Sequence, residues 1–343
     1  MKMFTKLALV SSMAISANAM AMQSMDDAAL SAATGQDGIN IGIGISKIEI
    51  EKVLIHDNDG LQTSTGITGA TGTASTTSSG AIVIKGNGQG TAATNPNFAN
   101  GIVITAPMNA AGTAVDNTRA LASHNLADLT IDTDKGTGTN GAFLNVAAAV
   151  SGLDIYIGEI GVSGSNAAST TAVRRGNDTT NYNAILSGLT IKTGVTSANI
   201  QLGAAPQGAM IVLNTTMQGG LEIKNLGIVD SSTKTGTADG TAGNRAAGQI
   251  FLESIKVSDA SNANLTVNAA VSVVGKEGSN NGYLRIITGS GATTPKTDMY
   301  IKGVHLGSQA AASIGDVEVQ GLQTYYFNGT ANVQGSVITI SGH

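Results

Sequence analysis

The sequence predicts an all-β fold made of many short strands joined by long loops rich in Gly and Thr. Charged residues make up only 12% of the chain, and the Glu, Lys and Arg residues that favour surface helices are scarce. Gly accounts for 45 of 343 residues, whereas Pro accounts for 4. Val, Ile and Thr, which favour strands, are common, and a short aliphatic spacing recurs along the chain.

The first 21 residues predict an export signal that is removed. Lys2 and Lys6 supply a basic head, residues 7–17 are uncharged and mostly apolar, and small residues favour cleavage after Ala21, with Ala19 as the next site. The apolar run is about half of the ~20 residues that a membrane-spanning helix needs. The chain has no Cys, which excludes a lipid anchor at an N-terminal Cys and disulfide bonds. We expect export through the inner membrane to the cell surface or extracellular space, or to the periplasm, with no transmembrane segment in the mature chain.

Residues 22–38 predict a short helix followed by a turn. Asp26 and Asp27 favour a helix N-terminus, Gly35 suits its C-terminal end, and Gln36 to Gly38 form a turn signal. Strand signals begin at Ile39. The remaining residues, 39–343, are expected to form a single β-rich domain.

The recurring spacing is an aliphatic residue, two others, an aliphatic residue, one other, and an aliphatic residue. Its last two positions alternate with polar residues, as in a strand with one buried face, whereas the first position is one residue out of phase. This predicts a bend or bulge before each strand, and Gly152, Gly188 and Gly303 fill the gap in three copies. The ten copies are Ile45/Ile48/Ile50, Ile50/Val53/Ile55, Leu126/Leu129/Ile131, Val150/Leu153/Ile155, Ile157/Ile160/Val162, Leu186/Leu189/Ile191, Ile223/Leu226/Ile228, Leu252/Ile255/Val257, Ile301/Val304/Leu306 and Ile314/Val317/Val319.

Two architectures accommodate these strands. A β-solenoid-like stack is favoured, because short aliphatic strands with few aromatic residues suit a narrow stacked core and uneven spacing suits uneven loops. The alternative is an elongated antiparallel β-sandwich. Further strands are predicted at residues 81–85, 101–105, 209–213, 265–274, 283–288 and 333–340.

Calcium is the one cofactor for which the sequence offers ligands. Asp57 and Asp59 stand in the turn-like run Asp-Asn-Asp-Gly, where carboxylate oxygens cluster as they do in calcium loops. Asp132 and Asp134 are a weaker pair of the same kind. Turn formation alone also explains the Asp57–Asp59 pattern, since Asp and Asn favour turns, and both readings stay open.

No arrangement of residues points to catalysis. The four histidines include no metal-type pair at short spacing, and no Gly-x-Ser-x-Gly elbow occurs. Gly136, Gly138 and Gly141 match a dinucleotide fingerprint, but their flanks suit a β-turn between strands. The net charge of -5 without a basic cluster argues against nucleic-acid binding. We therefore expect a non-enzymatic protein; the alternative function is an extracellular carbohydrate-binding or carbohydrate-cleaving β-helix, which the 3% aromatic content disfavours.

Two late segments suggest contact with a partner. Tyr325, Tyr326 and Phe327 form the densest aromatic cluster of the chain, and such residues serve either as packing or as the centre of a subunit contact. Residues 337–340 form a strand signal without charge, and an exposed edge there would accept a partner's strand.

The segment that follows the cleavage site carries a distinctive set of residues: Met25, Asp26, Asp27, Leu30, Thr34 to Ile39, and the strand signal through Ile50. With these residues it resembles the mature N-terminus of the FilA-type pilus assembly proteins and related surface proteins of Gram-negative bacteria. The resemblance implies a structural role at the cell surface, in pilus or filament assembly or in adhesion. It implies other assembly proteins, or further copies of this chain, as partners, and it supplies no catalytic residues.

Overall fold

The computed structural model describes residues 38–60, 78–168, 170–238, 241, 243–275, 282–289 and 294–342. Within these ranges the regular structure is all strand apart from one 3-10 turn, η1 at Ser231–Thr233, which confirms the all-β prediction. No helix in the described ranges is long and apolar enough to cross a membrane. The predicted signal peptide, residues 1–21, and the predicted helix that follows it lie outside the described residues.

Sheet A contains eight strands in the order β1-β6-β7-β12-β13-β16-β17-β22. Its edges are β1 and β22, the first and the last strand of the described chain. The bounds of its strands are β1 Ile39–Ile43, β6 Ala127–Asp134, β7 Phe143–Val150, β12 Thr196–Gly203, β13 Ile211–Met217, β16 Leu265–Val274, β17 Tyr283–Thr288 and β22 Ser336–Ile340.

Sheet B contains twelve strands. Its upper half has the order β2-β5-β8-β11-β14-β15-β18-β19, and β10, β9, β4 and β3 follow one another outward from β14 in the lower half. The bounds of its strands are β2 Lys47–Ile50, β3 Lys52–Asp57, β4 Gly80–Lys85, β5 Ile102–Thr105, β8 Asp154–Ile157, β9 Glu159–Ser165, β10 Asn177–Leu186, β11 Leu189–Lys192, β14 Leu221–Asp230, β15 Gly248–Asp259, β18 Thr297–Gly307 and β19 Ser313–Leu322.

A crease separates the two halves of sheet B, and most chain segments that form one half continue directly into the other. β2 and β3 are separated only by Glu51, β8 and β9 only by Gly158, and β10 and β11 by two residues. Backbone hydrogen bonds join these breaks: the Gly101 N–H donates to Glu51 O at 2.9 Å, and the Gly158 N–H donates to Gly101 O at 2.7 Å. In the longer strands the crease coincides with left-handed backbone at Asn225 (φ 57) and Gly303 (φ 63). The bend predicted inside the recurring aliphatic spacing is therefore confirmed at these positions.

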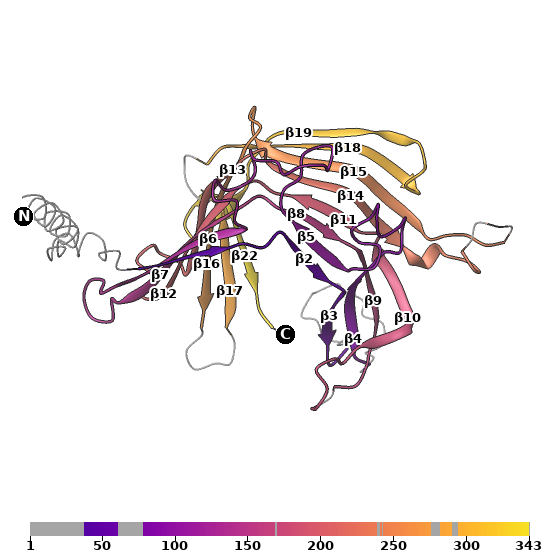
Figure 1. Ribbon diagram of the computed structural model, residues 1–343, viewed down its shortest axis with the longest axis horizontal. Coiled ribbons are helices and arrows are strands. Elements are labelled where there is room, and N and C mark those ends of the chain that lie inside the picture. The colour runs from indigo at the N-terminus through magenta and orange to yellow at the C-terminus, as the bar shows by residue number, and fades with distance from the viewer. Residues whose placement is uncertain are drawn as a thin grey trace, which may run out of the picture.

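The chain passes back and forth between the two sheets, usually after two to four strands. In Figure 1 sheet A lies on the left, the upper half of sheet B lies at the top right, and β3, β4, β9 and β10 descend at the lower right. Together they outline an arch, and the C-terminal end of the chain lies beneath it (Figure 1). A smaller hairpin, β20 Tyr325–Phe327 with β21 Asn332–Gln334, connects β19 to β22.

Every strand pair in the described ranges is antiparallel. The strands therefore extend sideways into two wide sheets, as in the antiparallel alternative, rather than stacking as the parallel coils typical of a solenoid. The individual strands expected at residues 265–274 and 283–288 coincide with β16 and β17, and those expected at residues 81–85 and 101–105 match β4 and β5 within one residue. The Gly136-x-Gly138-x-x-Gly141 run is the turn between antiparallel β6 and β7, so the β-turn interpretation of it is confirmed.

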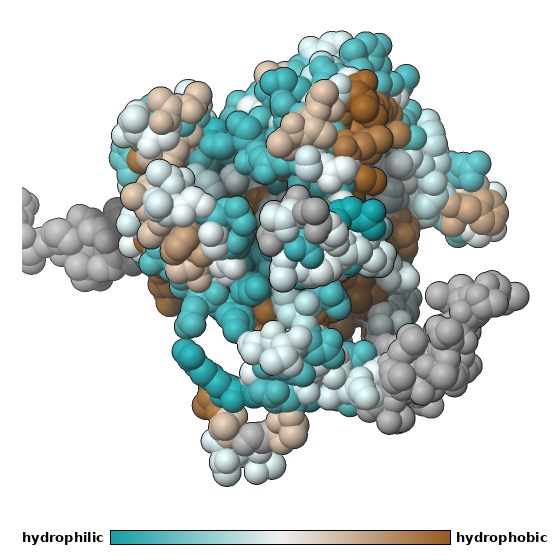
Figure 2. Space-filling model, turned by 90° about the vertical axis from the view of Figure 1, so that its right-hand side faces the viewer, coloured by the Kyte–Doolittle hydropathy of each residue, from teal (hydrophilic) through white to brown (hydrophobic). Residues whose placement is uncertain are grey.

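The buried core is thin for a chain of this length. In the described ranges the buried apolar side chains are mostly small or medium in size, Phe251 and Met217 being the largest, while many large aliphatic side chains stay exposed. In Figure 2 brown apolar atoms lie in recesses between the polar outer parts, and a further brown patch lies near the top, at the height of β18 and β19 in Figure 1.

Candidate assembly surface

A continuous row of aliphatic side chains crosses the upper half of sheet B from one edge to the other. Each residue pairs with the next across neighbouring strands, and all lie on one face because strand side chains alternate. The row begins at the β2 edge and ends at the β19 edge. Its members are Ile48, Ile104, Ile155, Ile191, Ile223, Ile255, Ile301 and Val317.

Sheet A carries a row of the same kind and the same width. Its members are Ile39, Ile131, Val146, Ile200, Ile211, Val271, Ile286 and Ile338. The six inner residues are half-buried. The two outer ones are more exposed, at 59% for Ile39 and 48% for Ile338, because neither has a neighbouring strand on its outer side in the described ranges.

Sheet B has a second aliphatic row on the lower side of the crease. It runs through Val53, Ile84, Ile160, Leu186, Ile228, Ile250 and Leu306. Its last three members are exposed, Leu306 at 51%. The rows and the crease explain six of the ten copies of the aliphatic spacing, because in these copies the first two aliphatic residues lie on opposite sides of the crease. These copies begin at Ile50, Ile157, Leu186, Ile223, Leu252 and Ile301.

The open edges of the two sheets differ in charge. In the described ranges β1 pairs only with β6 and β22 only with β17, and their sequences, INIGI and SVITI, contain no charged residue. An uncharged, apolar edge strand is the kind that natural proteins usually protect, because it offers unpaired backbone groups to another strand. The edges of sheet B are charged: β2 carries Lys47 and Glu49, and β19 carries Asp316 and Glu318.

The predicted partner-contact residues lie at the β22 end of this surface. Tyr325 and Phe327 are 60% and 66% exposed on the β20–β21 hairpin, whereas Tyr326 is half-buried. The hairpin is tied to the sheet edge, since Ser336 Oγ of β22 lies 2.9 Å from Thr324 Oγ1. Two large exposed aromatic side chains beside an open edge suit a subunit contact, and that role stays a prediction.

The predicted calcium ligands form a turn. Asp57 Oδ1 accepts hydrogen bonds from the backbone N–H groups of Asp59 (3.3 Å) and Gly60 (3.2 Å), as in an Asx-turn. Asp134 binds the backbone N–H of Gly136 in the same manner. Among the described residues no group of three or more His, Cys, Asp or Glu side chains is placed to hold a metal ion. Calcium binding at Asp57 and Asp59 stays a prediction.

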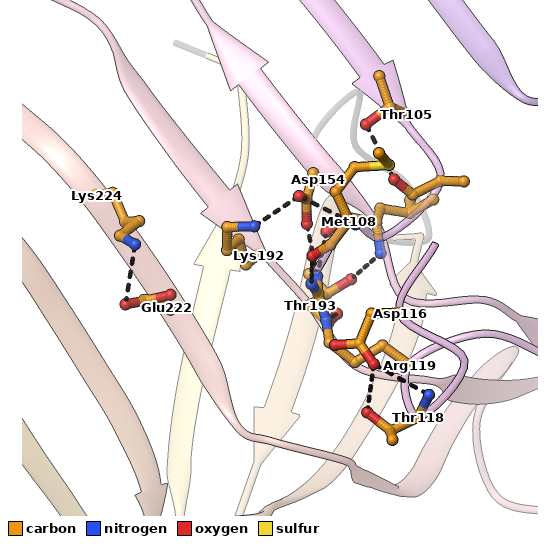
Figure 3. A network of polar contacts seen from close by, with 12 residues as sticks. Thr105, Met108, Asp116, Thr118, Arg119, Asp154, Lys192, Thr193, Glu222 and Lys224 are labelled. Carbon is orange, nitrogen blue, oxygen red and sulfur yellow. Dashed lines mark hydrogen bonds and ion pairs between the residues drawn. The ribbon is translucent and has the colours of Figure 1, made fainter. Parts of the chain in front are cut away.

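The most deeply buried charge in sheet B is structural. Asp154 is fully buried and accepts from Arg119 Nη2 at 2.7 Å and from Lys192 Nζ at 2.6 Å, as Figure 3 shows. Arg119 also donates to the carbonyl oxygens of Thr193 (2.8 Å) and Leu153 (3.0 Å). These residues lie where the chain passes between sheets A and B, so the cluster fixes that junction, which sequence reasoning did not identify.

Tyr182 and His56 make structural contacts in the lower half of sheet B. Burial raises the pKa of the Tyr182 hydroxyl, and the nearby Glu159 carboxylate raises it further, so the hydroxyl stays neutral. Its ring lies under Lys85 Nζ, 4.0 Å from the ring centre, and covers Gly161, where a Cβ atom would lie 2.4 Å from it. A neutral, covered tyrosine cannot act as a general base. His56 Nδ1 lies 2.6 Å from Ser165 Oγ with no carboxylate in that hydrogen bond.

One polar cleft of about 570 Å³ lies over the crease, beneath the loop that joins β4 to β5. Asn97 anchors this loop, because its Nδ2 donates to the carbonyl oxygens of Asn100 (3.0 Å) and Tyr156 (3.1 Å). The amide side chains of Asn225, Gln249 and Gln309 line the cleft beside the ring of Phe251 and the hydroxyls of Ser187 and Thr190. Sequence reasoning missed the cleft because its lining comes from six separate segments.

The comparison with known proteins adds a partial family match. Residues 1–134 match the model of a family of unknown function, DUF6160. This part includes the predicted export signal and all strands through β6. No curated protein and no solved structure matches the chain.

Proposed function

We propose that this protein is an exported, non-enzymatic structural protein of the bacterial surface that takes part in pilus or filament assembly or in adhesion. The observation that carries the proposal is the pair of aliphatic rows, one across sheet A and one across the upper half of sheet B, which end at open edges with Ile39, Ile338 and Val317 exposed. Folded proteins that act alone rarely leave apolar, uncharged edge strands open. The predicted export signal and the resemblance to FilA-type proteins support the same role.

The proposal is tested on cells that lack the protein. We expect fractionation to find the protein at the surface of wild-type cells, and negative-stain microscopy to show that deletion alters surface filaments or that adhesion falls. A periplasmic, monomeric protein together with an unchanged cell surface in the deletion strain would refute the proposal.

Carbohydrate binding is a second candidate function, and the polar cleft over the crease favours it. Uncharged amides and hydroxyls beside an aromatic ring are groups that recognise sugar hydroxyls. A glycan array is expected to show binding that the double variant Gln249→Ala, Gln309→Ala abolishes. The matched control, Asn332→Ala on the β20–β21 hairpin, should bind as the wild type does; equal binding by all three proteins would place any glycan site elsewhere.

A further inference from the structure

The number of strands in each sheet determines how a second copy could extend it. Sheet A and the upper half of sheet B are both eight strands wide, and every neighbouring pair is antiparallel. The two edge strands of each sheet therefore run in opposite directions. A copy that is shifted sideways without being turned over presents its β1 antiparallel to β22 and its β2 antiparallel to β19, which continues the alternation in both sheets.

Such a shift also continues the aliphatic rows. In sheet B the row ends with Val317 on β19 and begins with Ile48 on β2, so these two residues would become neighbours. In sheet A, Ile338 on β22 lies on the same face as Ile39 and Ile41 on β1. The end residues that are exposed in a single copy would then gain the apolar neighbour that every inner residue of the row already has.

A charged row on the opposite face of sheet B fits the same register. Each of its members is the neighbour in sequence of one member of the aliphatic row, and the side-chain charge alternates from Asp154 to Lys256. Its members are Lys47, Thr105, Asp154, Lys192, Glu222, Lys256, Tyr300 and Glu318. If Val317 pairs with Ile48 of the next copy, the antiparallel register places Glu318 opposite Lys47 of that copy, an attractive pair, and Asp316 opposite Glu49, a like-charged pair. Lys47 Nζ lies 2.5 Å from Glu49 Oε1 of its own copy, and this ion pair offsets part of the repulsion between Glu49 and Asp316.

The neighbouring acidic residue on β19 is already bonded within its own copy. Asp316 accepts from the Tyr300 hydroxyl and, at 2.8 Å, from the backbone N–H of Gly303. These hydrogen bonds lower the pKa of Asp316 and hold its side chain toward β18. Glu318 is hydrogen-bonded only to Gln320 Nε2 among the contacts described for it, and it is exposed to an incoming strand.

From the strand directions, the aliphatic rows and the Glu318–Lys47 pair together, we propose that copies of the chain add head to tail. β22 and β19 of one copy are then joined to β1 and β2 of the next. The inference deepens the proposed surface role and rests on it for its biological meaning. Because the two surfaces in contact differ, the contact is heterologous and gives an open-ended series of oligomers or a ring rather than a two-fold dimer. The exposed aromatic side chains of Tyr325 and Phe327 would lie beside the new interface.

Charge reversal at the sheet B edge tests the register. We expect the purified protein to show a concentration-dependent series of oligomers in sedimentation velocity, and Glu318→Lys or Lys47→Glu to weaken association by about tenfold or more, since each places like charges together. The double variant Glu318→Lys, Lys47→Glu restores opposite charges and should recover association. Lys234→Glu, an exposed reversal near η1, is the matched control and should associate as the wild type does.

A second pair of variants tests the sheet A edge. Ile338→Lys places a charge on the open strand β22 and should shorten the oligomer series, as edge lysines do in natural proteins. Val273→Lys changes a side chain that is 66% exposed on the same face but on the inner strand β16, and it should leave the series unchanged. Circular dichroism of each variant establishes that it is folded.

The outcomes separate this inference from the proposed function. A strictly monomeric protein, a dimer that does not grow, or single charge reversals that associate as tightly as the wild type would overturn the head-to-tail contact. If those results came with the protein at the cell surface, only the contact would be wrong. If the purified protein assembled as expected but cells carried none of it at the surface, the surface role would be wrong and the contact would stand.

Discussion

Sheet A and the upper half of sheet B have the same width and the same kind of aliphatic row, yet their polar faces are supported differently. The polar face of sheet B is covered by the loop over the crease and by the segment that brings Arg119 to Asp154, and it contains Val83 and Val103, the most completely buried aliphatic side chains described. In the described ranges β1 and β22 are the open edges of sheet A, and their sequences carry no charge. The same strand pattern therefore surrounds a buried ion cluster in sheet B and forms uncharged open edges in sheet A.

The polar faces of the two sheets also differ in the kind of side chain that they contain. Sheet B uses charges, with a fully buried carboxylate held by two cations. Sheet A uses neutral amides: Asn145, Asn199 and Gln201 are joined by side-chain hydrogen bonds of 2.8 to 3.1 Å. A buried ion that loses its partner is far more costly than a half-buried amide that turns to water. Substitutions should therefore lower the free energy of unfolding most in sheet B.

The largest effect is expected from removing the centre of the sheet junction. Asp154→Ala leaves Arg119 and Lys192 without their buried partner and should lower the free energy of unfolding by about 3–5 kcal/mol. Urea denaturation at neutral pH measures it. Glu222→Gln is the matched control, because Glu222 and Lys224 are 3.7 Å apart on the same face and partly exposed, and it should cost less than about 1 kcal/mol. Equal effects would show that the cluster does not hold the junction.

A smaller effect is expected from trimming one valine in each sheet. Val103→Ala removes two methyl groups from a side chain that is 0% exposed and should destabilise sheet B by about 1.5–3 kcal/mol. Val273→Ala in sheet A, at 66% exposure, should change the free energy of unfolding by less than about 0.5 kcal/mol. The same urea titrations compare the two, and a larger loss in sheet A would reverse the comparison.

The crease of sheet B provides a third comparison. Gly303→Ala introduces a Cβ atom at φ 63 and 2.4 Å from the Glu253 side chain, so a loss of about 1–3 kcal/mol is expected. Gly275→Ala at the end of β16 in sheet A meets no atom within 4 Å and should be neutral or stabilise by up to about 1 kcal/mol. Thermal unfolding of both variants tests whether the bend requires glycine.

The smallest effect concerns pH at the β19 edge. Backbone N–H groups of Gly321 and Ser261 lower the pKa of Asp298, and those of Gly303 together with the Tyr300 hydroxyl lower the pKa of Asp316. A carboxyl whose pKa is lower in the folded state stabilises the fold above its unfolded value of about 4, and that stability is lost as pH falls through the folded value. The melting temperature should therefore fall in this acidic range.

The variant Asp316→Asn isolates that contribution. It should have a lower melting temperature than the wild type at neutral pH, and the difference should shrink in acid, where the wild-type carboxyl is protonated. Asp132→Asn in sheet A, for which no such set of backbone donors is described, is the control. A difference that stayed constant from neutral to acidic pH would mean that the charge of Asp316 contributes nothing.

The sequence by itself determined the fold class, most strand positions and the bends. Local side-chain alternation and the out-of-phase aliphatic residue were enough, since both depend on residues within one strand and its neighbours along the chain. Tyr325 and Phe327 are exposed, and the contact role that their clustering predicts stays a prediction.

Only the tertiary structure decided how the strands combine. Antiparallel sheets, rather than stacked coils, result from pairings between segments far apart in the chain, such as β2 with β5 and β1 with β6. The Asp154 cluster and the polar cleft also join distant segments, so no local pattern reveals them. The edges follow from the same pairings: an aliphatic residue has the same sequence signal on an inner strand and on an outer one, and only the position of its strand leaves Ile39, Ile338 and Val317 open to a partner.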